Sequence, residues 1–435
     1  MAVGKEGNVK WVDGLRGIAS ILVVFTHLTR PWNGELFSST SAEDAAPRLL
    51  QLPYFRILIQ GRIGVTIFAF VTGYVCALKP IKLCKQGNQE AALTAISKSS
   101  LRRFPRLFLP AAAATCVNFV LAELGLFAVA QHQDSWLVDI QSPRQIPNLS
   151  AALRNLIRNI VGTWTRSTND YDNNQWTMLP LLKGSLWVYV FMIATAYVQP
   201  RFRMWASFGL WVYFLCASDS AFGMQFFWGT LLADLQSHEP FTALVASRPR
   251  ISAVLCTVLM LTGLTFASFP EGHPEWMGWS RTLLDTMTPV LPANADLPRF
   301  GSGLGLEFIS LAVLLSPQVL QRALSSRVLL FLGRMSFAVY LLHGALLRTV
   351  LVWMLFGVHT LPDHENEEGM MVTTRLKFPG GWTLVAWQVV WLPMVYAIAN
   401  LWIGYVDPWC DRATNRLVEW VRLDAGEKGS VLPTR

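Results

Sequence analysis

The chain has 435 residues, of which 52% are hydrophobic and only 15% are charged, and it carries a formal net charge of +8. Soluble domains contain about 25% charged residues, so this composition excludes an ordinary water-soluble protein. The basic residues gather beside apolar runs, and no basic module interleaved with aromatic residues stands out, which argues against nucleic-acid binding. The six cysteines are scattered without CxxC or zinc-like Cys/His spacing, so the sequence indicates no metal and no redox cofactor.

Apolar segments long enough to cross a bilayer recur along almost the whole chain. They predict an all-α, polytopic membrane bundle of about ten transmembrane helices. The segments cover residues 15–31, 61–79, 107–130, 179–198, 204–218, 221–236, 251–269, 304–321, 328–356 and 381–405.

An even number of spans places both termini on the same side of the membrane. Four basic loops alternate onto that side: residues 79–106, 199–203, 237–250 and 322–334. Basic loops favour the cytosol, so we expect both termini to be cytosolic. The membrane is expected to be the endoplasmic reticulum or another endomembrane. We expect a single membrane domain over residues 1–435, with a core at about 11–410 and a short cytosolic tail at 407–435.

The first apolar segment carries two polar residues, Arg16 and His27. They are eleven residues apart, so on a helix they project from one face at heights that differ by about 16 Å. Histidine can take a proton from a hydroxyl at neutral pH and return it to a leaving thiolate, as acyl transfer from a thioester requires. A lone histidine in a membrane more often bonds a neighbouring helix, but the arginine on the same face favours a functional role.

Two later spans also contain polar residues. His343 falls deep in the span that begins near Arg334, where an interhelical hydrogen bond and a role in catalysis or acceptor binding are about equally expected. Arg62 opens the second span at its non-cytosolic end and could simply extend its charge to the interface. Gly64 and Gly73 in the same span allow close approach of helices.

Three arginines, Arg102, Arg103 and Arg106, stand at the cytosolic entry of the third span. Arginine binds phosphate in a bidentate manner and keeps its charge, which suits the phosphates of coenzyme A. An orientation signal that faces anionic lipid explains the same residues equally well.

Together these segments resemble acyltransferase family 3, a family of integral membrane acyltransferases, in the branch common in filamentous fungi. The resemblance runs in order from about residue 11 to 410. It rests on Asp13-Gly-Leu-Arg-Gly with the Arg16–His27 spacing, Arg62-x-Gly-Val-x-x-Phe…Gly-Tyr74, Arg103…Arg106-Leu…Pro110 and Leu332-Gly-Arg-x-Ser-Phe…Tyr-Leu-Leu-His343-Gly.

The resemblance implies a ten-helix enzyme that takes an acyl group, often acetyl, from cytosolic acyl-CoA and usually gives it to a hydroxyl. The histidine of the family's first helix corresponds to His27 and its partner arginine to Arg16, with Asp13 expected to hold Arg16. Arg102, Arg103 and Arg106 would bind the coenzyme A phosphates. His343, Arg62, Thr72 and Tyr74 would line the site of the acceptor.

The chain departs from the family pattern in two places. Thr72 replaces the family's small polar residue before Gly-Tyr, which is a mild change. In the stretch Trp176-Thr-Met-Leu-Pro-Leu-Leu-Lys-Gly-Ser185, the position of the family's usual glutamate holds Leu181. If that carboxylate orients the histidine or binds the acceptor, either the acceptor differs or the scaffold serves other chemistry.

The leading hypothesis is therefore an acyl-CoA-dependent O-acyltransferase that acts on a small lipophilic metabolite, such as a terpenoid or polyketide of secondary metabolism. No motif suggests a covalent acyl-enzyme, so direct attack by the acceptor is expected. An acid–base cyclase or isomerase that uses His27 and His343 without coenzyme A is the first alternative. A proton-coupled transporter is the second, although the sequence shows no inverted repeat.

Overall fold

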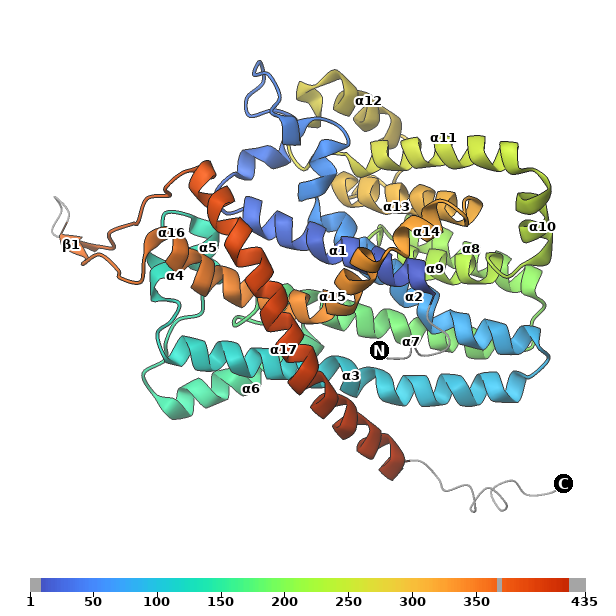
Figure 1. Ribbon diagram of the computed structural model, residues 1–435, viewed down its shortest axis with the longest axis horizontal. Coiled ribbons are helices and arrows are strands. Elements are labelled where there is room, and N and C mark those ends of the chain that lie inside the picture. Colours follow the sequence, from blue (N-terminus) through green and yellow to red (C-terminus); the bar gives the residue numbers. More distant parts are fainter. Residues whose placement is uncertain (1–8, 366–369, 422–435) are drawn as a thin grey trace.

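The computed structural model describes residues 9–365 and 370–421 and is almost entirely helical, as expected (Figure 1). Its α-helices are α1 (Lys10–Thr29), α2 (Gly61–Lys85), α3 (Gln89–Glu123), α4 (Ala128–His132), α5 (Trp136–Gln141), α6 (Leu149–Thr165), α7 (Met178–Ala194), α8 (Pro200–Cys216), α9 (Gly223–Leu235), α10 (Glu239–Ser247), α11 (Pro249–Ala267), α12 (Gly278–Met287), α13 (Leu297–Leu315), α14 (Leu320–Leu324), α15 (Arg327–Leu346), α16 (Val352–Phe356) and α17 (Gly381–Val421).

Shorter elements complete the chain. They are the 3-10 turns η1 (Gly34–Phe37), η2 (Leu49–Gln51), η3 (Phe55–Ile59), η4 (Asn173–Thr177) and η5 (Pro274–Trp276), the π-helical turn η6 (Leu347–Leu351), and the antiparallel strands β1 (His364–Glu365) and β2 (Met371–Val372).

Eight helical segments of the described chain are long and apolar enough to cross a membrane. The prediction of an all-α membrane bundle is therefore confirmed. The two other segments expected to span are also helices: α8, with 17 residues, and α9, with 13. The short α9 packs along α2 and α8, so its side chains are mostly buried inside the protein.

Helix α1 lies at the centre of the bundle, between α2 and α15, and α15 packs in turn against α17. Close packing of α1 on α15 depends on Gly333, because a Cβ atom there would overlap the backbone carbonyl of Asp13. Gly73 allows α2 an equally close approach to the backbone of Phe226 in α9. Small residues at helix contacts are the usual means of tight packing in a membrane.

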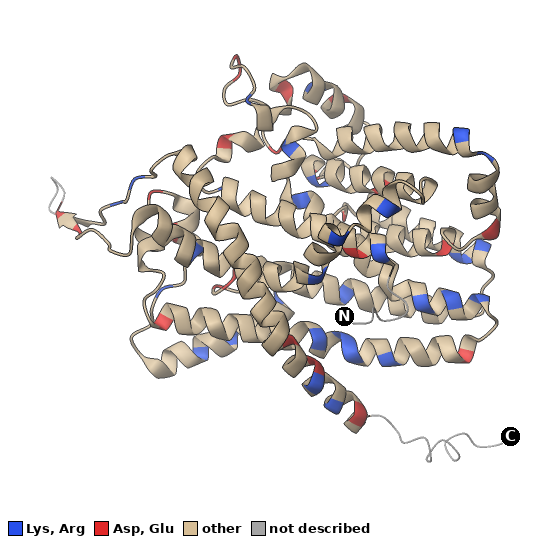
Figure 2. Cartoon of the chain, viewed as in Figure 1, with Lys and Arg blue, Asp and Glu red and all other residues tan. Residues whose placement is uncertain are grey.

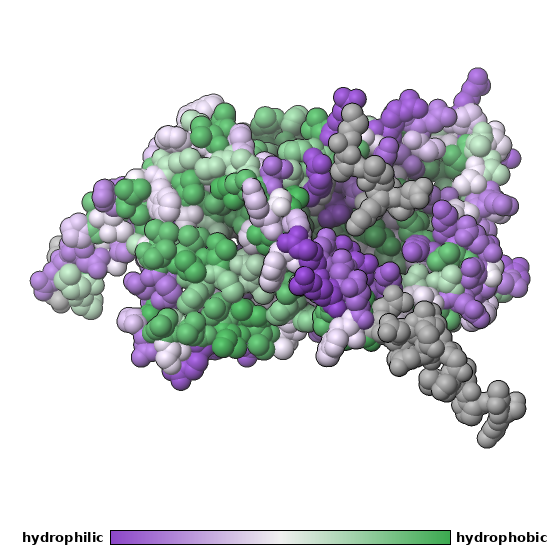
Figure 3. All heavy atoms as spheres, turned by 60° about the horizontal axis from the view of Figure 1, so that its bottom comes forward, coloured by the Kyte–Doolittle hydropathy of each residue, from purple (hydrophilic) through white to green (hydrophobic). Residues whose placement is uncertain are grey.

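The two ends of the bundle differ in charge. Lys and Arg gather at the end where α2 passes into α3 and where α10 joins α11, on the right of Figure 2. We call this the basic end. The opposite end carries η1 to η3, α4, α5, α12 and the two strands (Figure 1). Seen as a surface, a broad apolar area lies towards the left and hydrophilic residues cover the basic end (Figure 3).

Helix α17 continues without interruption through residue 407 to Val421, so the expected tail begins inside this helix. The last turns of α17 carry polar residues, and Asp411 and Asn415 contact Arg106 and Arg102 of α3. Residues 422–435, the rest of the expected tail, lie outside the described part of the chain.

Candidate active site

A cavity of about 340 Å³ opens at the end of the bundle opposite the basic end. Its mouth is formed where α1 ends and where α2 and α13 begin, and these three helix ends contribute Arg30, Arg62 and Arg299. Further inside, the cavity is lined by His27 of α1 and Tyr340 of α15. His27 also lines a smaller cavity of about 80 Å³ beside α5 and η6.

His27 and His343 form a hydrogen-bonded pair between α1 and α15. Nδ1 of His27 lies 2.8 Å from Nε2 of His343, and Nδ1 of His343 lies 2.9 Å from the carbonyl oxygen of Val339. A carbonyl only accepts, so Nδ1 of neutral His343 carries the proton and its Nε2 must accept. Nδ1 of His27 then donates, which leaves Nε2 of His27 as an unprotonated base.

A network of side chains holds this pair in place. The hydroxyl of Tyr340 donates to the backbone carbonyl of Asn174 and lies 2.7 Å from the hydroxyl of Thr177. The amide of Asn174 is 3.5 Å from Nε2 of His343. These bonds attach the turn η4 to α15 directly beside His343, so the histidine pair sits on connected, rigid elements.

Asp172 stands just before the span that begins at Asn173. Its carboxylate accepts from the backbone N–H of Asn174, and Arg348 lies near enough to attract its charge. Burial nevertheless dominates and raises the pKa of the Asp172 carboxyl to about 6. Arg348 donates to the backbone carbonyls of Gly344, Gln141 and Tyr171, so it joins α15 to α5 and to the loop before η4.

A second polar cluster lies towards the basic end. Arg16 pairs with Asp13 at 3.5 Å, as expected. Arg103 points inward from α3 and donates to the hydroxyls of Ser185 at 2.8 Å and Thr72 at 3.3 Å. Arg103 lies close enough to Arg16 for their positive charges to interact, so these residues of α1 and α3 form one polar cluster.

The residues predicted from the sequence thus divide between two places. His27 and Arg62 line the cavity, whereas Asp13, Arg16, Arg103 and Thr72 gather towards the basic end. His343 was expected to line the acceptor site, but it is fully buried behind His27 and does not line the cavity. Arg102 and Arg106 turn away from Arg103 and contact Asn415 and Asp411 of α17. Tyr74 lies outside the cavity, with its ring against Trp11 and its hydroxyl bonded to Gln236. Leu181 is buried among apolar residues, and its carbonyl accepts from the Ser185 hydroxyl.

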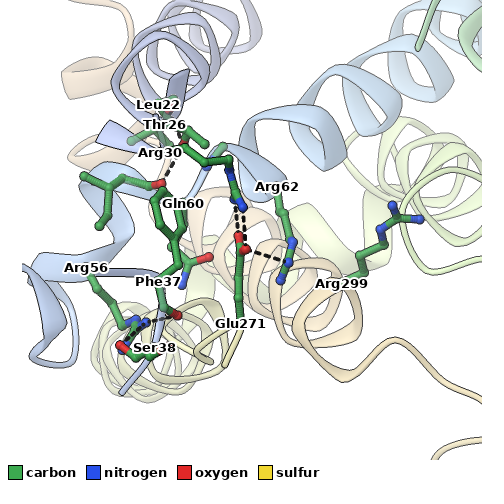
Figure 4. Close-up of polar contacts among 12 residues, drawn as sticks. Leu22, Thr26, Arg30, Phe37, Ser38, Arg56, Gln60, Arg62, Glu271 and Arg299 are labelled. Carbon is green, nitrogen blue, oxygen red and sulfur yellow. Dashed lines mark hydrogen bonds and ion pairs between the residues drawn. The ribbon is translucent and has the colours of Figure 1, made fainter. Parts of the chain in front are cut away.

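An ion-paired group at the cavity mouth was missed by the sequence analysis. Glu271 lies in the loop after α11. Its carboxylate accepts hydrogen bonds from both terminal nitrogens of Arg30, at 2.8 and 2.5 Å, and forms an ion pair with one terminal nitrogen of Arg62 at 3.0 Å (Figure 4). Arg299 stands apart from this group in Figure 4, with its guanidinium directed away from Glu271 and no bond to it. Arg30 follows His27 by three residues and so shares its helix face, a spacing that could have marked it. Glu271 and Arg299 lie far away in the sequence, and no local pattern marks them.

Comparison with known proteins identifies the family of the chain. An acyltransferase domain, that of acyltransferase family 3, matches residues 9–406 and so nearly the whole chain. The chain belongs to this family. The O-acetyltransferase PaAT-1 of Phomopsis amygdali is 28% identical over 431 residues, which covers 92% of this chain and 82% of that protein.

Two further fungal relatives are named acyltransferases. Acyltransferase clz18 of Cochliobolus lunatus is 25% identical and covers 83% of this chain, or 87% of its own length. Acyltransferase R4 of a Phoma species is 24% identical, with 78% of this chain and 82% of that protein covered. No solved structure matches the chain. The resemblance expected from the four motifs is confirmed, and the chain is a membrane acyltransferase.

Proposed function

We propose that this acyltransferase takes an acyl group from acyl-CoA and transfers it to a hydroxyl of a small lipophilic metabolite in the cavity. Acetyl is the expected acyl group, and a terpenoid or polyketide of secondary metabolism is the expected acceptor. The observation that carries the proposal is the His27–His343 pair, which leaves Nε2 of His27 unprotonated, together with the place of His27 in the wall of a cavity large enough for a small molecule.

In the proposed reaction, Nε2 of His27 removes the proton of the acceptor hydroxyl while its oxygen attacks the thioester carbonyl. The tetrahedral intermediate then collapses, breaking the carbon–sulfur bond and expelling the coenzyme A thiolate, which takes the proton back from His27. His343 is a positioning residue: it fixes the tautomer of His27 and steadies the positive charge that His27 gains during the reaction.

The donor is proposed to enter from the basic end, with acyl-CoA as a co-substrate and no resident cofactor. Arg103 supplies an inward-facing guanidinium for a coenzyme A phosphate, and Arg16, held by Asp13, adds positive charge beside it. Arg102 and Arg106 stand at the rim of the same region. Because Arg16 and His27 differ in height by about 16 Å on α1, the long pantetheine arm would have to carry the thioester along this helix.

The proposed setting is an endomembrane such as the endoplasmic reticulum, with both termini and the basic end in the cytosol. Lys and Arg concentrate at that end, as the positive-inside rule requires of a cytosolic face (Figure 2). The acceptor would then reach His27 from the opposite end, through the mouth lined by arginine side chains.

Comparative mass spectrometry of metabolites tests the proposal. The host carrying a deletion of the gene is compared with the same host restored with wild type or with His27→Ala. Acyl transfer predicts an accumulating compound lighter than the lost product by one acyl unit, and restoration by wild type alone. An accumulating compound of equal mass would instead indicate an isomerase or cyclase. An unchanged set of compounds, redistributed between cells and medium, would indicate transport.

A further inference from the structure

We propose that the acceptor carries a carboxylate, which Arg62 and Arg299 bind at the cavity mouth while the acceptor hydroxyl lies at His27. This inference rests on the proposed function and narrows its acceptor to hydroxylated lipophilic acids. The charged side chains that line the cavity are three arginines, and the described chain places no carboxylate among the lining residues.

The three arginines are not equivalent. Arg30 donates hydrogen bonds from both terminal nitrogens to the carboxylate of Glu271, and its guanidinium lies 4.1 Å from the ring centroid of Phe37. Its charge is therefore matched by a bidentate partner, and its hydrogen bonds are largely used. Arg30 holds Glu271 in place and leaves ligand binding to the other two.

Arg62 is only partly satisfied. Its Nη2 shares an oxygen of Glu271 with Arg30, at 3.0 Å. Its Nη1 is shielded from solvent and has no hydrogen-bond partner in the described chain. A shielded guanidinium nitrogen without an acceptor is costly, and an anion in the cavity would supply the missing acceptor.

Arg299 has more hydrogen-bond donors available to a ligand than Arg62 has. Its Nε contacts Asp296 at 3.1 Å, and the described residues offer no hydrogen bond to either terminal nitrogen. Arg299 lines the cavity, and its guanidinium stands 5.9 Å from the ring centroid of Trp176, another lining residue. Its side chain is half exposed, so a ligand at the mouth can reach it. Two free terminal nitrogens form the planar fork that matches the two oxygens of a carboxylate.

Free guanidinium nitrogens, and not an excess of positive charge, distinguish this mouth. Two carboxylates, those of Glu271 and Asp296, pair with the three guanidinium groups. A third carboxylate, Asp219, lies near Arg299 and balances the local charge, but its hydrogen bonds come from backbone N–H groups at the start of α9. A ligand carboxylate would therefore be bound through the unpartnered guanidinium nitrogens.

The rest of the cavity wall offers both apolar and neutral polar side chains. The apolar ones are Val23, Val65, Ala221 and Trp176, and the polar ones are Thr26, Thr66, Asn174, Thr177 and Tyr340. Its volume of about 340 Å³ falls at the small end of ligand pockets, which favours a compact acceptor. A compact hydroxy acid would place its ionised group at the mouth, its hydrocarbon against these side chains, and its hydroxyl near Nε2 of His27.

The accumulating compound provides the first test. In the deletion host restored with His27→Ala, the compound that differs from the lost product by one acyl unit should move from organic solvent into aqueous bicarbonate, as a carboxylic acid does. A neutral compound with the same acyl difference would overturn this inference and leave the proposed acyl transfer standing. If no compound differs by an acyl unit, the proposed function itself fails.

The second test compares that compound with its methyl ester in membranes containing wild type, Arg299→Ala, Arg62→Lys or the control Arg48→Ala. Arg48 is an exposed arginine that pairs with Glu35 and does not line the cavity. Wild type and the control should prefer the acid by about tenfold or more in kcat/KM. Both cavity variants should lose this preference through a higher KM for the acid, with the ester unaffected. Equal use of acid and ester by wild type, or equal losses on both by the variants, would overturn the assignment.

Discussion

The two polar regions on α1 are built differently although they share one helix. At His27, two neutral imidazole rings form a directed chain of hydrogen bonds that ends on the carbonyl of Val339, and the arginines of the same cavity stand apart at its mouth. Near Arg16, charged and hydroxyl groups predominate, and Arg103 bonds two hydroxyls while keeping its charge. The first arrangement fixes where a proton sits, which acid–base chemistry needs. The second concentrates positive charge, which phosphate binding needs.

If the two regions differ in this way, the largest loss of activity should follow from removing the proposed base, His27. His27→Ala should lower kcat by about 100- to 10,000-fold, the range that a positioned general base contributes, without preventing folding. Acyl transfer is measured in membranes, and folding by size-exclusion chromatography in detergent. His238→Ala is the matched control, because His238 precedes α10 and does not line the cavity. Retained turnover in His27→Ala would refute the role of His27.

His343→Leu should give the second largest loss, about a hundredfold in kcat, because His27 would lose the acceptor that sets its tautomer. A structural role alone would lower the amount of folded protein and leave kcat per folded molecule unchanged. His343→Gln retains an acceptor and should restore part of the rate. A pH profile of kcat/KM separates the roles further, since only positioning predicts that its acid limb moves in His343→Leu.

The arginines of α3 sharpen the comparison at the basic end. Arg103→Ala should raise the KM for acyl-CoA by about tenfold with little change in kcat, as expected for a lost charged hydrogen bond. Arg106→Ala should change the KM for acyl-CoA by less than about twofold, because the exposed Arg106 is paired with Asp411 on the surface. If the two variants had equal effects, the inward-facing Arg103 would not be the principal phosphate ligand.

The smallest expected effect concerns how the free energy of unfolding depends on pH through Asp172. Because burial raises the pKa of Asp172 from 3.8 to about 6, the folded chain holds this proton more tightly than the unfolded chain. The stability of wild type relative to Asp172→Asn should therefore fall as pH rises from about 4 to about 6, and then level off. Melting temperatures in detergent across this range test it. A difference that is independent of pH would contradict the ionisation of Asp172 in this window.

Much of the fold could be predicted because a bilayer demands long apolar segments. Each of the ten expected segments contains a helix, although α8 and α9 are too short to meet the length of a full span. The shared helix face of Arg16 and His27 could also be predicted, because their spacing alone fixes their relative direction on α1.

Contacts between helices could not be predicted in the same way. His343 is 316 residues from His27, and their hydrogen bond exists only because α15 packs on α1. Glu271 stands in a loop whose position depends on the backbone bond from its N–H to the carbonyl of Phe37. Tyr74 shares a motif with Thr72 but faces Trp11, because side chains two residues apart on a helix point in different directions.

The central claim is that acyl-CoA donates an acyl group to a hydroxyl at His27. The most direct measurement supplies membranes with the accumulating compound and with acetyl-CoA labelled with ¹³C in its acetyl group. Wild type should form a product that carries the labelled acetyl group and release one free coenzyme A for each product, and His27→Ala should form neither. An unlabelled product, or labelled product formed equally by His27→Ala, would contradict it.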